Sequence, residues 1–442
     1  MDLFGGLTTE IMRMEAEKAF KSGEYKSAVK KYEKLFLDAL NNNDPKATLY
    51  SEKVGDCYER MEHQDKKERE EDHRKAAEYY IKTADLLRKV NQFEKAGEMY
   101  EKGAKAFDEI GNLKAAGDFY MESAAMFQKT QDFLNASYAY HQAAEYYEKG
   151  GAYEKASETY RESVVCDLKI HDTANASESF KRAALNYQRL NDYSKAIDSY
   201  ASSMELDTVN REYLKVAETY DKIADCYLEL GDKKNTIYYH EKSADLRAAN
   251  NDLKSAGMSY REIGQVLEDE NEFEKAVGYF LKSAKTFYRA PDNAEEGFSY
   301  EKAARIYEKL EKYGLAGKHF MESARSYGVV GNEVLADEST IKAAVMFLKA
   351  VEQTEDNLEK ADFSLKAAQS YDEAKQYLKS ADSYNLYSEY MMLASQTEKA
   401  YEGFNQAARQ YLKSGKTWEA AEAFINHENY KEAVEIYDKL AK

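Results

Sequence analysis

A repeat of 20 residues runs from residue 91 to residue 350 without insertion and gives thirteen consecutive units. Two neighbouring units read NQFEKAGEMYEKGAKAFDEI (91–110) and GNLKAAGDFYMESAAMFQKT (111–130). In most units, alanine stands at positions 6 and 14, Tyr or Phe at position 10, and an aromatic residue at position 17. The offsets of four, four and three residues place these side chains on one face of an α-helix.

One continuous helix through several units is excluded by geometry. At about 100° of rotation per residue, 20 residues shift the apolar face by about 200°, so no neighbouring helix could follow it. Each unit is therefore predicted to be a helix of about 15 to about 17 residues followed by a short turn. Turn residues such as Gly111-Asn112, Gly231-Asp232 and Gly331-Asn332 stand at the unit junctions, where helix caps belong.

Alternate units differ in their opening residues, which indicates two kinds of helix that pair in a hairpin. The sequence thus predicts an all-α fold, a right-handed α-solenoid of helical hairpins of about 40 residues. We expect an apolar N-terminal tail over 1–7, the solenoid over 8–350, and C-terminal helical repeats that cap it over 351–442.

Outside the regular units, helices are predicted at about 46–62 and 73–89, and the charged stretch 62–73 is predicted to be a loop or a solvated helix extension. Beyond residue 350 the register breaks. Residues 358–384 keep the residue types of the repeat but not its phase, and residues 397–415 recover it. Two shorter helices are expected after residue 416.

Charge and cysteine content restrict the partners and the compartment. The net charge of −18 disfavours nucleic acid and gives no general attraction to anionic membranes. Cys57, Cys166 and Cys226 lie far apart and form no CxxC pair, so we expect a reducing compartment. No secretory signal pattern or long apolar run is present, and a cytoplasmic protein, peripheral to membranes at most, is expected.

No pattern for chemistry stands out. The seven histidines are scattered without metal-ligand spacing, and His240, at position 10 of its unit, is predicted to be packed in the core. Gly415-Lys416-Thr417 ends like a phosphate-binding loop, but the first glycine of that motif is replaced by Gln410, so a helix C-cap is favoured. We therefore predict no catalytic residue, no metal, no cofactor and no small-molecule substrate, and hence no enzyme.

Three charged residues occupy the position that is usually aromatic. Asp167, Asp207 and Arg247 stand at position 17 of three successive alternate units. One interpretation is a polar ladder that lines a partner-binding site. The other is a change of helix phase, in which Leu168, Leu206 and Leu246 cover the core instead, because buried unpaired charge is unfavourable. The tyrosines off the apolar stripe, Tyr138 and Tyr239, are further candidates for partner binding.

Segments of the repeat resemble known families. The stretch AEKAFKSGEYKSAVKKYEKL (16–35) resembles a tetratricopeptide repeat, with Gly23, Tyr25, Ala28 and Tyr32 around its inner turn. The period of this chain's hairpins is longer than the usual period of that repeat. Segments such as EKAGEMYEKGAKAFDEIGNLKAAGDFYMESAAMF (94–127) are similar to the central repeats of the soluble NSF attachment protein (SNAP) family, and the resemblance covers most of residues 73–350. SNAPs are adaptors that bring an AAA ATPase to SNARE complexes.

The two ends of the chain extend this resemblance. The segment Leu3-Phe4-Gly5-Gly6-Leu7 resembles the apolar, glycine-containing loop by which SNAPs touch membranes, which implies membrane contact through Leu3, Phe4 and Leu7. The alternative is a tail that packs on the first helix. Near the C-terminus, Glu432, Glu435, Asp438 and Leu440 are similar to the acidic, leucine-containing region by which SNAPs engage the ATPase, although this chain ends in Lys442.

Two functions are consistent with these features. The resemblance implies a SNAP-like adaptor that grips a coiled-coil, SNARE-type bundle and recruits an AAA ATPase in membrane fusion. The alternative is a general tetratricopeptide scaffold or regulator that binds soluble peptides or proteins.

Overall fold

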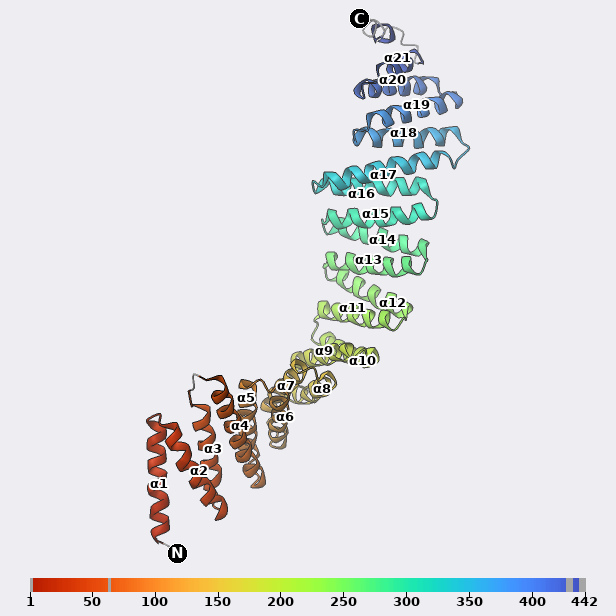
Figure 1. The fold of residues 1–442 in the computed structure, drawn as a ribbon. Helices are drawn as coiled ribbons and strands as arrows, with labels where there is room; N and C mark the ends of the chain where they lie inside the picture. The colour runs from red at the N-terminus through yellow and green to blue at the C-terminus, as the bar shows by residue number, and fades with distance from the viewer. Residues whose placement is uncertain (1–2, 63–64, 427–431, 437–442) are drawn as a thin grey trace. The chain divides into compact units, whose positions relative to one another are not determined.

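A computed structural model of the chain describes residues 3–62, 65–426 and 432–436. Within these ranges the backbone is helical or forms turns between helices, and no residue is in a strand. The all-α repeat fold predicted from the sequence is therefore confirmed. The chain divides into two compact units, Met1–Asp232 and Lys233–Lys442, and within each the helices stack in chain order (Figure 1).

The first unit holds helices α1 (Leu3–Lys21), α2 (Tyr25–Asn41), α3 (Lys46–Glu59), α4 (Lys66–Lys89), α5 (Phe93–Glu109), α6 (Leu113–Lys129), α7 (Phe133–Lys149), α8 (Tyr153–Lys169), α9 (Thr173–Arg189), α10 (Tyr193–Val209) and α11 (Tyr213–Glu229). The second unit holds α12 (Lys233–Ala249), α13 (Leu253–Asp269), α14 (Phe273–Arg289), α15 (Asn293–Lys309), α16 (Tyr313–Val329), α17 (Glu333–Val351), α18 (Asn357–Glu373), α19 (Tyr377–Leu393), α20 (Thr397–Lys413) and α21 (Thr417–Asn426). Residues 432–436 are also helical.

Each repeat unit from α5 to α16 is a single helix, and these helices are equal in length, as the repeat predicted. The turn between α5 and α6 shows how one helix ends and the next begins. Gly111 has φ +71°, and the N–H of Asn112 donates to the carbonyl of Phe107, which closes α5 with an αL residue. The side chain of Asn112 then accepts from the N–H of Ala115 and caps α6.

Small and aromatic residues alternate in the core, as predicted. The alanines at positions 6 and 14, such as Ala96, Ala104 and Ala276, are fully buried. The aromatic rings at position 10, such as Tyr100 and Phe280, are buried beside them. Buried alanines let neighbouring helices approach closely, and the rings fill the space on either side.

In several helices a glycine at position 7 contacts the aromatic ring at position 17 of the next helix. A Cβ atom added to Gly257 would lie 2.9 Å from the ring of Phe287, and one added to Gly117 would lie 2.8 Å from the ring of Tyr147. Gly97, Gly297 and Gly317 meet rings in the same way. The glycine and the ring hold the same two repeat positions in every case, so position 7 of one helix receives position 17 of the next.

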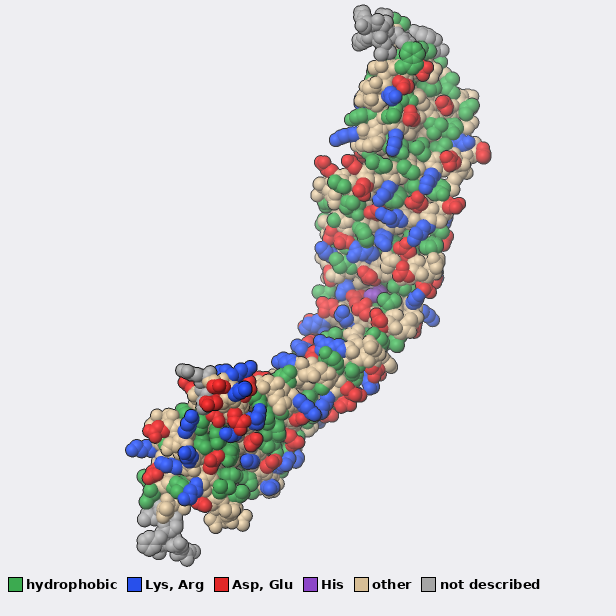
Figure 2. Space-filling model, viewed as in Figure 1, with side chains coloured by type: hydrophobic (Ala, Val, Ile, Leu, Met, Phe, Trp, Pro, Cys, Tyr) green, Lys and Arg blue, Asp and Glu red, His purple; other side chains and the backbone are tan. Residues whose placement is uncertain are grey.

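Acidic, cationic and aromatic side chains form a repeated contact on the surface of three successive helices, which we call the edge clamp. In α15, the Lys309 ammonium lies 2.6 Å from Glu268 of α13 and 5.5 Å from the ring centroid of Phe273 of α14. Three further clamps are Glu148–Arg189–Tyr153, Glu308–Lys349–Tyr313 and Asp372–Lys413–Tyr377. Figure 2 shows acidic and basic side chains intermingled along the visible face of both units.

The structure refines the predictions outside the regular units. Helix α4 begins at Lys66, so most of the charged stretch 62–73 is a helix extension. Beyond residue 350 the phase changes, as expected over 358–384, but it changes only once: residues 397–415 keep the shifted phase and do not recover the earlier one. Helices α18 to α21 begin at residues 357, 377, 397 and 417, so the regular spacing continues after a single insertion of four residues. Helix α17 is two residues longer than its predecessors, and the turn 352–356 supplies the rest.

The position-7 contact gives a testable prediction. Replacement Gly257→Ala forces the Phe287 ring to move and is expected to lower the free energy of unfolding by about 1–3 kcal/mol. Gly278, in the middle of α14, is the control, because no atom lies within 4 Å of the Cβ position there. Gly278→Ala is expected to stabilise by about 0.5–1 kcal/mol through helix propensity. Urea unfolding measures both changes, and equal effects would contradict the proposed contact.

Candidate functional site

Asp167 and Asp207 lie inside the first unit rather than on a surface. Asp167 is fully buried at the end of α8, and Asp207 is 2% exposed in α10. In α8 and α10 the expected change of helix phase does not occur: Asp167 and Asp207 are buried, whereas Leu168 is 42% exposed and Leu206 is only partly buried. The interpretation of a polar ladder that lines a partner-binding surface is therefore wrong for Asp167 and Asp207. Their carboxylates lie in the interior, at the position that an aromatic ring occupies in the other repeats.

Compensating substitutions explain how two carboxylates are accommodated in the core. Where Asp replaces the ring at position 17, serine replaces glycine at position 7 of the preceding helix. Ser137 donates a hydrogen bond to Asp167, and Ser177 donates to Asp207 at 2.6 Å. A buried carboxylate costs little only when it is hydrogen-bonded and paired, and the serine supplies the first of these partners.

Basic side chains on the same helices complete the two sites. The Lys181 ammonium lies 2.7 Å from the Oδ2 atom of Asp207. His141 Nε2 lies 3.3 Å from Oδ2 of Asp167 and 3.3 Å from Oγ of Ser179. Since Ser179 and Lys181 both belong to α9, one polar seam runs from α7 to α10 and includes both aspartates.

The other predicted partner-binding residues are not members of this seam. Tyr138 of α7 is 46% exposed. Tyr239 of α12 is partly buried, with its ring 5.1 Å from that of the more exposed Tyr238. Arg247, also in the second unit, is mostly buried, and its Nη1 atom donates to Ser259 at 2.9 Å.

The predicted terminal sites lie at the limits of the described residues. Helix α1 begins at Leu3, but the side chains of Leu3, Phe4 and Leu7 lie outside the described residues. Near the C-terminus, Glu435 is exposed, whereas Asp438 and Leu440 lie outside the described residues.

The cysteines, His240 and Gly415, considered from the sequence as candidates for reactive or ligand-binding roles, have roles in packing and helix termination. Burial raises the pKa of the thiols of Cys57, Cys166 and Cys226, to about 12, 11 and 11. His240 is buried, as predicted, and Gly415 closes α20 with φ +79°. In the described part of the chain, no group of three or more His, Cys, Asp or Glu residues is arranged to hold a metal ion. None of the helices in that part is long and apolar enough to cross a membrane.

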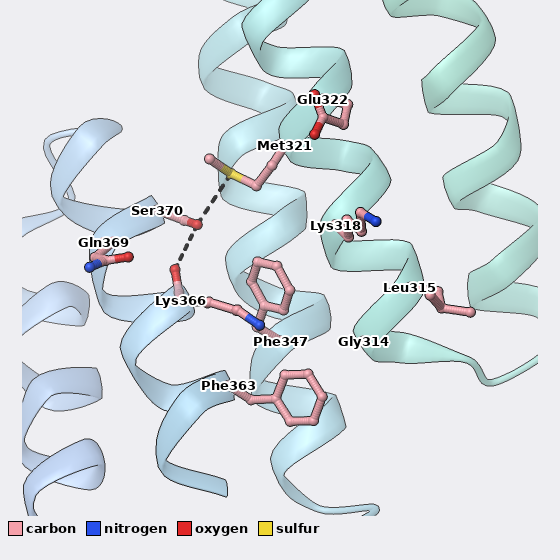
Figure 3. Close-up of a pocket in the computed structure, with 10 residues that line it drawn as sticks. All are labelled: Gly314, Leu315, Lys318, Met321, Glu322, Phe347, Phe363, Lys366, Gln369 and Ser370. Atoms are coloured by element: carbon pink, nitrogen blue, oxygen red, sulfur yellow. Dashed lines mark hydrogen bonds between the residues drawn. The ribbon is translucent and has the colours of Figure 1, made fainter. Parts of the chain in front are cut away.

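A cleft between α16 and α18, over α17, is a site that the sequence did not indicate. Its volume is about 630 Å³. The floor contains Phe347 of α17, which is 4% exposed, and Phe363 of α18, whose ring stacks on Phe347 at a centroid distance of 6.3 Å (Figure 3). The other lining residues are Gly314, Leu315, Lys318, Met321, Glu322, Lys366, Gln369 and Ser370.

The four-residue insertion accounts for the place of this cleft. Helices α14 and α16 begin at residues 273 and 313, in step with the repeat, whereas α18 begins at residue 357, four residues later than the same step would place it. The shift changes the positions that face each other. Ser370, the fourteenth residue of α18, lies 3.3 Å from the sulfur of Met321, the ninth residue of α16.

His319, the sequence neighbour of the lining residue Lys318, lies in a stack of aromatic rings with two residues of α15. Its imidazole is stacked between Tyr300 and Tyr307, at centroid distances of 5.8 and 5.4 Å. Burial, with the nearby positive charges of Lys318 and Lys285, lowers its pKa to about 4. In the first unit Phe119 is stacked between Tyr100 and Phe107 in the same way.

The depressed pKa of His319 predicts a pH-dependent stability. Below about pH 6.5 the unfolded chain binds a proton at this histidine, while the folded chain does so only near pH 4. Stability is therefore lost as the pH falls through this window. His319→Phe is expected to remove up to about 3 kcal/mol of that loss, and His171→Gln, in an exposed turn, is the control. Urea unfolding at pH 7, 5.5 and 4.5 measures the difference, and identical pH profiles for wild type and His319→Phe would contradict it.

The Ser–Asp substitution pair gives a double-mutant prediction. Asp207→Phe alone leaves the Ser177 hydroxyl and the Lys181 ammonium without their carboxylate partner, and Ser177→Gly alone removes a buried hydrogen bond, so each is expected to destabilise by about 1–3 kcal/mol. The double variant recreates the contact of the other repeats. Its destabilisation is expected to be at least about 1 kcal/mol smaller than the sum of the two, as urea unfolding would show. If the destabilisation of the double variant equals the sum of the two single values, the two positions are not coupled and the proposed Ser–Asp pairing is wrong.

Comparisons with known proteins match this fold. The family model described as "Soluble NSF attachment protein, SNAP" matches residues 62–237 and again residues 170–336, which together make up more than half of the chain. A search of curated protein sequences finds no match.

Several solved structures are also similar. The aspartyl phosphate phosphatase F of Bacillus subtilis is 12% identical, with a TM-score of 0.35, over 89% of this chain and 94% of that one. The Signal Transduction ATPase with Numerous Domains with a tetratricopeptide repeat sensor, from Pyrococcus horikoshii, is 13% identical, with a TM-score of 0.33, over 84% of this chain. This chain spans 54% of that protein. The TPR2AB domain of yeast Sti1 is 15% identical, with a TM-score of 0.27, over 63% of this chain and 98% of that one.

Proposed function

The chain belongs to the soluble NSF attachment protein (SNAP) family, and on that premise we propose that it is a non-enzymatic adaptor. It grips a helical, SNARE-type bundle and recruits an AAA ATPase to that bundle in vesicle traffic. The observation that carries the proposal is the family match, which runs through the repeats from residue 62 to residue 336.

The repeat geometry supports a role in gripping a long partner. Helices of equal length at a constant spacing along the chain present equivalent exposed positions at regular intervals along each unit. A helical bundle offers a matching repeated surface. Tyr138 and Tyr239, with the exposed Tyr238, are proposed to contact the partner. Asp167 and Asp207 act from the interior, by holding α7 to α10 in register.

The two ends of the chain supply the remaining contacts in this proposal. Leu3, Phe4 and Leu7 insert into the membrane surface and keep the adaptor near the bundle. Glu435, which is exposed, and Asp438 with Leu440 engage the ATPase. Two or three apolar side chains give only weak attachment, so the membrane contact acts together with the grip on the bundle.

A flotation experiment tests the adaptor function. The purified full chain is mixed with liposomes that carry an assembled SNARE bundle, with liposomes that carry a single unassembled SNARE, and with bare liposomes. We expect strong flotation with the assembled bundle only, and an AAA ATPase of the NSF type should float only when both bundle and adaptor are present. Failure to bind the assembled bundle would reject the adaptor function in favour of a scaffold for soluble partners.

The same experiment tests the N-terminal contact. The double substitution Leu3→Ser with Phe4→Ser is expected to weaken flotation with the bundle roughly tenfold or more, because each apolar side chain contributes about 1.5–3 kcal/mol on burial. The melting temperature should not change. Leu134→Ser is the control, since this leucine is 65% exposed on α7. Equal flotation of the double variant and the control would assign the segment no membrane role.

A further inference from the structure

The cleft between α16 and α18 lies where the chain passes beyond the part that the family model matches. The match ends at residue 336, so α16 falls within it, while α17 from residue 337 onward and all of α18 fall outside. The insertion that separates α16 from α18 therefore lies beyond the matched residues. A site at this junction is not explained by the adaptor function proposed above.

The shape and lining of the cleft suit one large apolar side chain. Its floor combines the stacked rings of Phe347 and Phe363 with the thioether of Met321 (Figure 3). Its rim is exposed: Leu315 is 43% exposed, and Lys318 and Gln369 are also exposed. A small molecule in an open cleft keeps much of its surface in water, whereas a side chain anchored on a protein segment is held by the contacts around it.

The charges around the cleft indicate which charge the partner carries next to its apolar side chain. Glu322 is paired with Arg325 at 2.8 Å, and Lys366 is paired with Asp362 at 2.5 Å and covers both rings. Lys318, by contrast, makes no ion pair within the described part of the chain and stands exposed on α16. The uncompensated charge at the rim is thus positive, although the whole chain carries −18.

Together with burial, the positive charge of Lys318 lowers the pKa of the neighbouring histidine. The adjacent residue, His319, has a pKa held low by burial and by Lys318 and Lys285, so the lysines create a field that disfavours any further positive charge here. The same field favours an anionic group at the rim. Burial of an apolar anchor in a pocket with a charge pair beside it is the pattern of an interaction hot spot.

We propose that this cleft binds an acidic segment of a partner protein, which inserts a Phe, Leu or Trp side chain between α16 and α18 and places an Asp or Glu beside Lys318. The segment buries its anchor on Phe347, Phe363 and Met321. Because the part of the site formed by α17 from residue 337 onward and by α18 lies beyond the family match, the site adds a partner to the chain without replacing the one gripped by the repeats.

A displayed library of random twelve-residue peptides, selected on the purified full chain, tests the proposal. We expect the enriched peptides to share a large apolar residue next to Asp or Glu. Synthetic copies are then titrated by fluorescence anisotropy against wild type, Lys318→Glu and Gln369→Trp. Both positions are exposed, so the folds should be intact, and each substitution is expected to raise Kd at least tenfold.

Matched controls make the outcome decisive. Lys234→Glu changes the net charge as Lys318→Glu does, but at an exposed position of α12, and should leave Kd unchanged. Peptides in which Lys replaces Asp and Glu should not bind. Enrichment of no common pattern, equal binding to Lys318→Glu and wild type, or a monomer–dimer equilibrium abolished by Gln369→Trp would overturn the proposal, the last by assigning the cleft to a second copy of the chain. Flotation with the SNARE bundle is expected to be unaffected by Lys318→Glu, so the two proposals fail separately.

Discussion

The packing of one helix against the next depends on a ring that lies over a small residue of the preceding helix. Where glycine holds position 7, the ring from position 17 of the next helix occupies the space where a larger side chain would stand, as Phe287 does over Gly257. The residue types at these two positions vary along the chain, as in Ser157 with Tyr187 and Val277 with Tyr307. Where Asp167 and Asp207 replace the ring, Ser137 and Ser177 replace the glycine, so the interface keeps its spacing and changes its chemistry.

Much of the fold could be predicted because periodicity is a local property. The regular spacing of the helices, the buried alanines and the turn at Gly111-Asn112 all follow from the requirement that each helix bury one stripe and end in a cap. The burial of Asp167 could not be predicted from the sequence of its own helix. A charged residue on an apolar stripe suggests a rotated helix, and only its partner on the preceding helix, Ser137, shows that the stripe is intact.

The cleft was missed for a related reason. An insertion of four residues reads in the sequence as a loss of phase, and nothing local shows that the period resumes at Asn357. The cleft results from the mismatch between α16 and α18, which face each other across α17 with shifted positions. It is a property of two helices that are distant in sequence, while Phe347 and Phe363 each resemble ordinary core aromatics.

The edge clamp couples helices that are not immediate neighbours in the stack. In a simple repeat array each element interacts only with its immediate neighbours, and stability is a sum of single-helix and nearest-neighbour terms. A cation such as Lys309 joins helices that are two apart, from Glu268 of α13 across Phe273 of α14. Each ion pair is weak because its cation is partly exposed to solvent, yet it adds a next-nearest-neighbour term. Loss of one helix from the end of such an array weakens two further helices at once, which steepens the transition between a frayed and an intact stack.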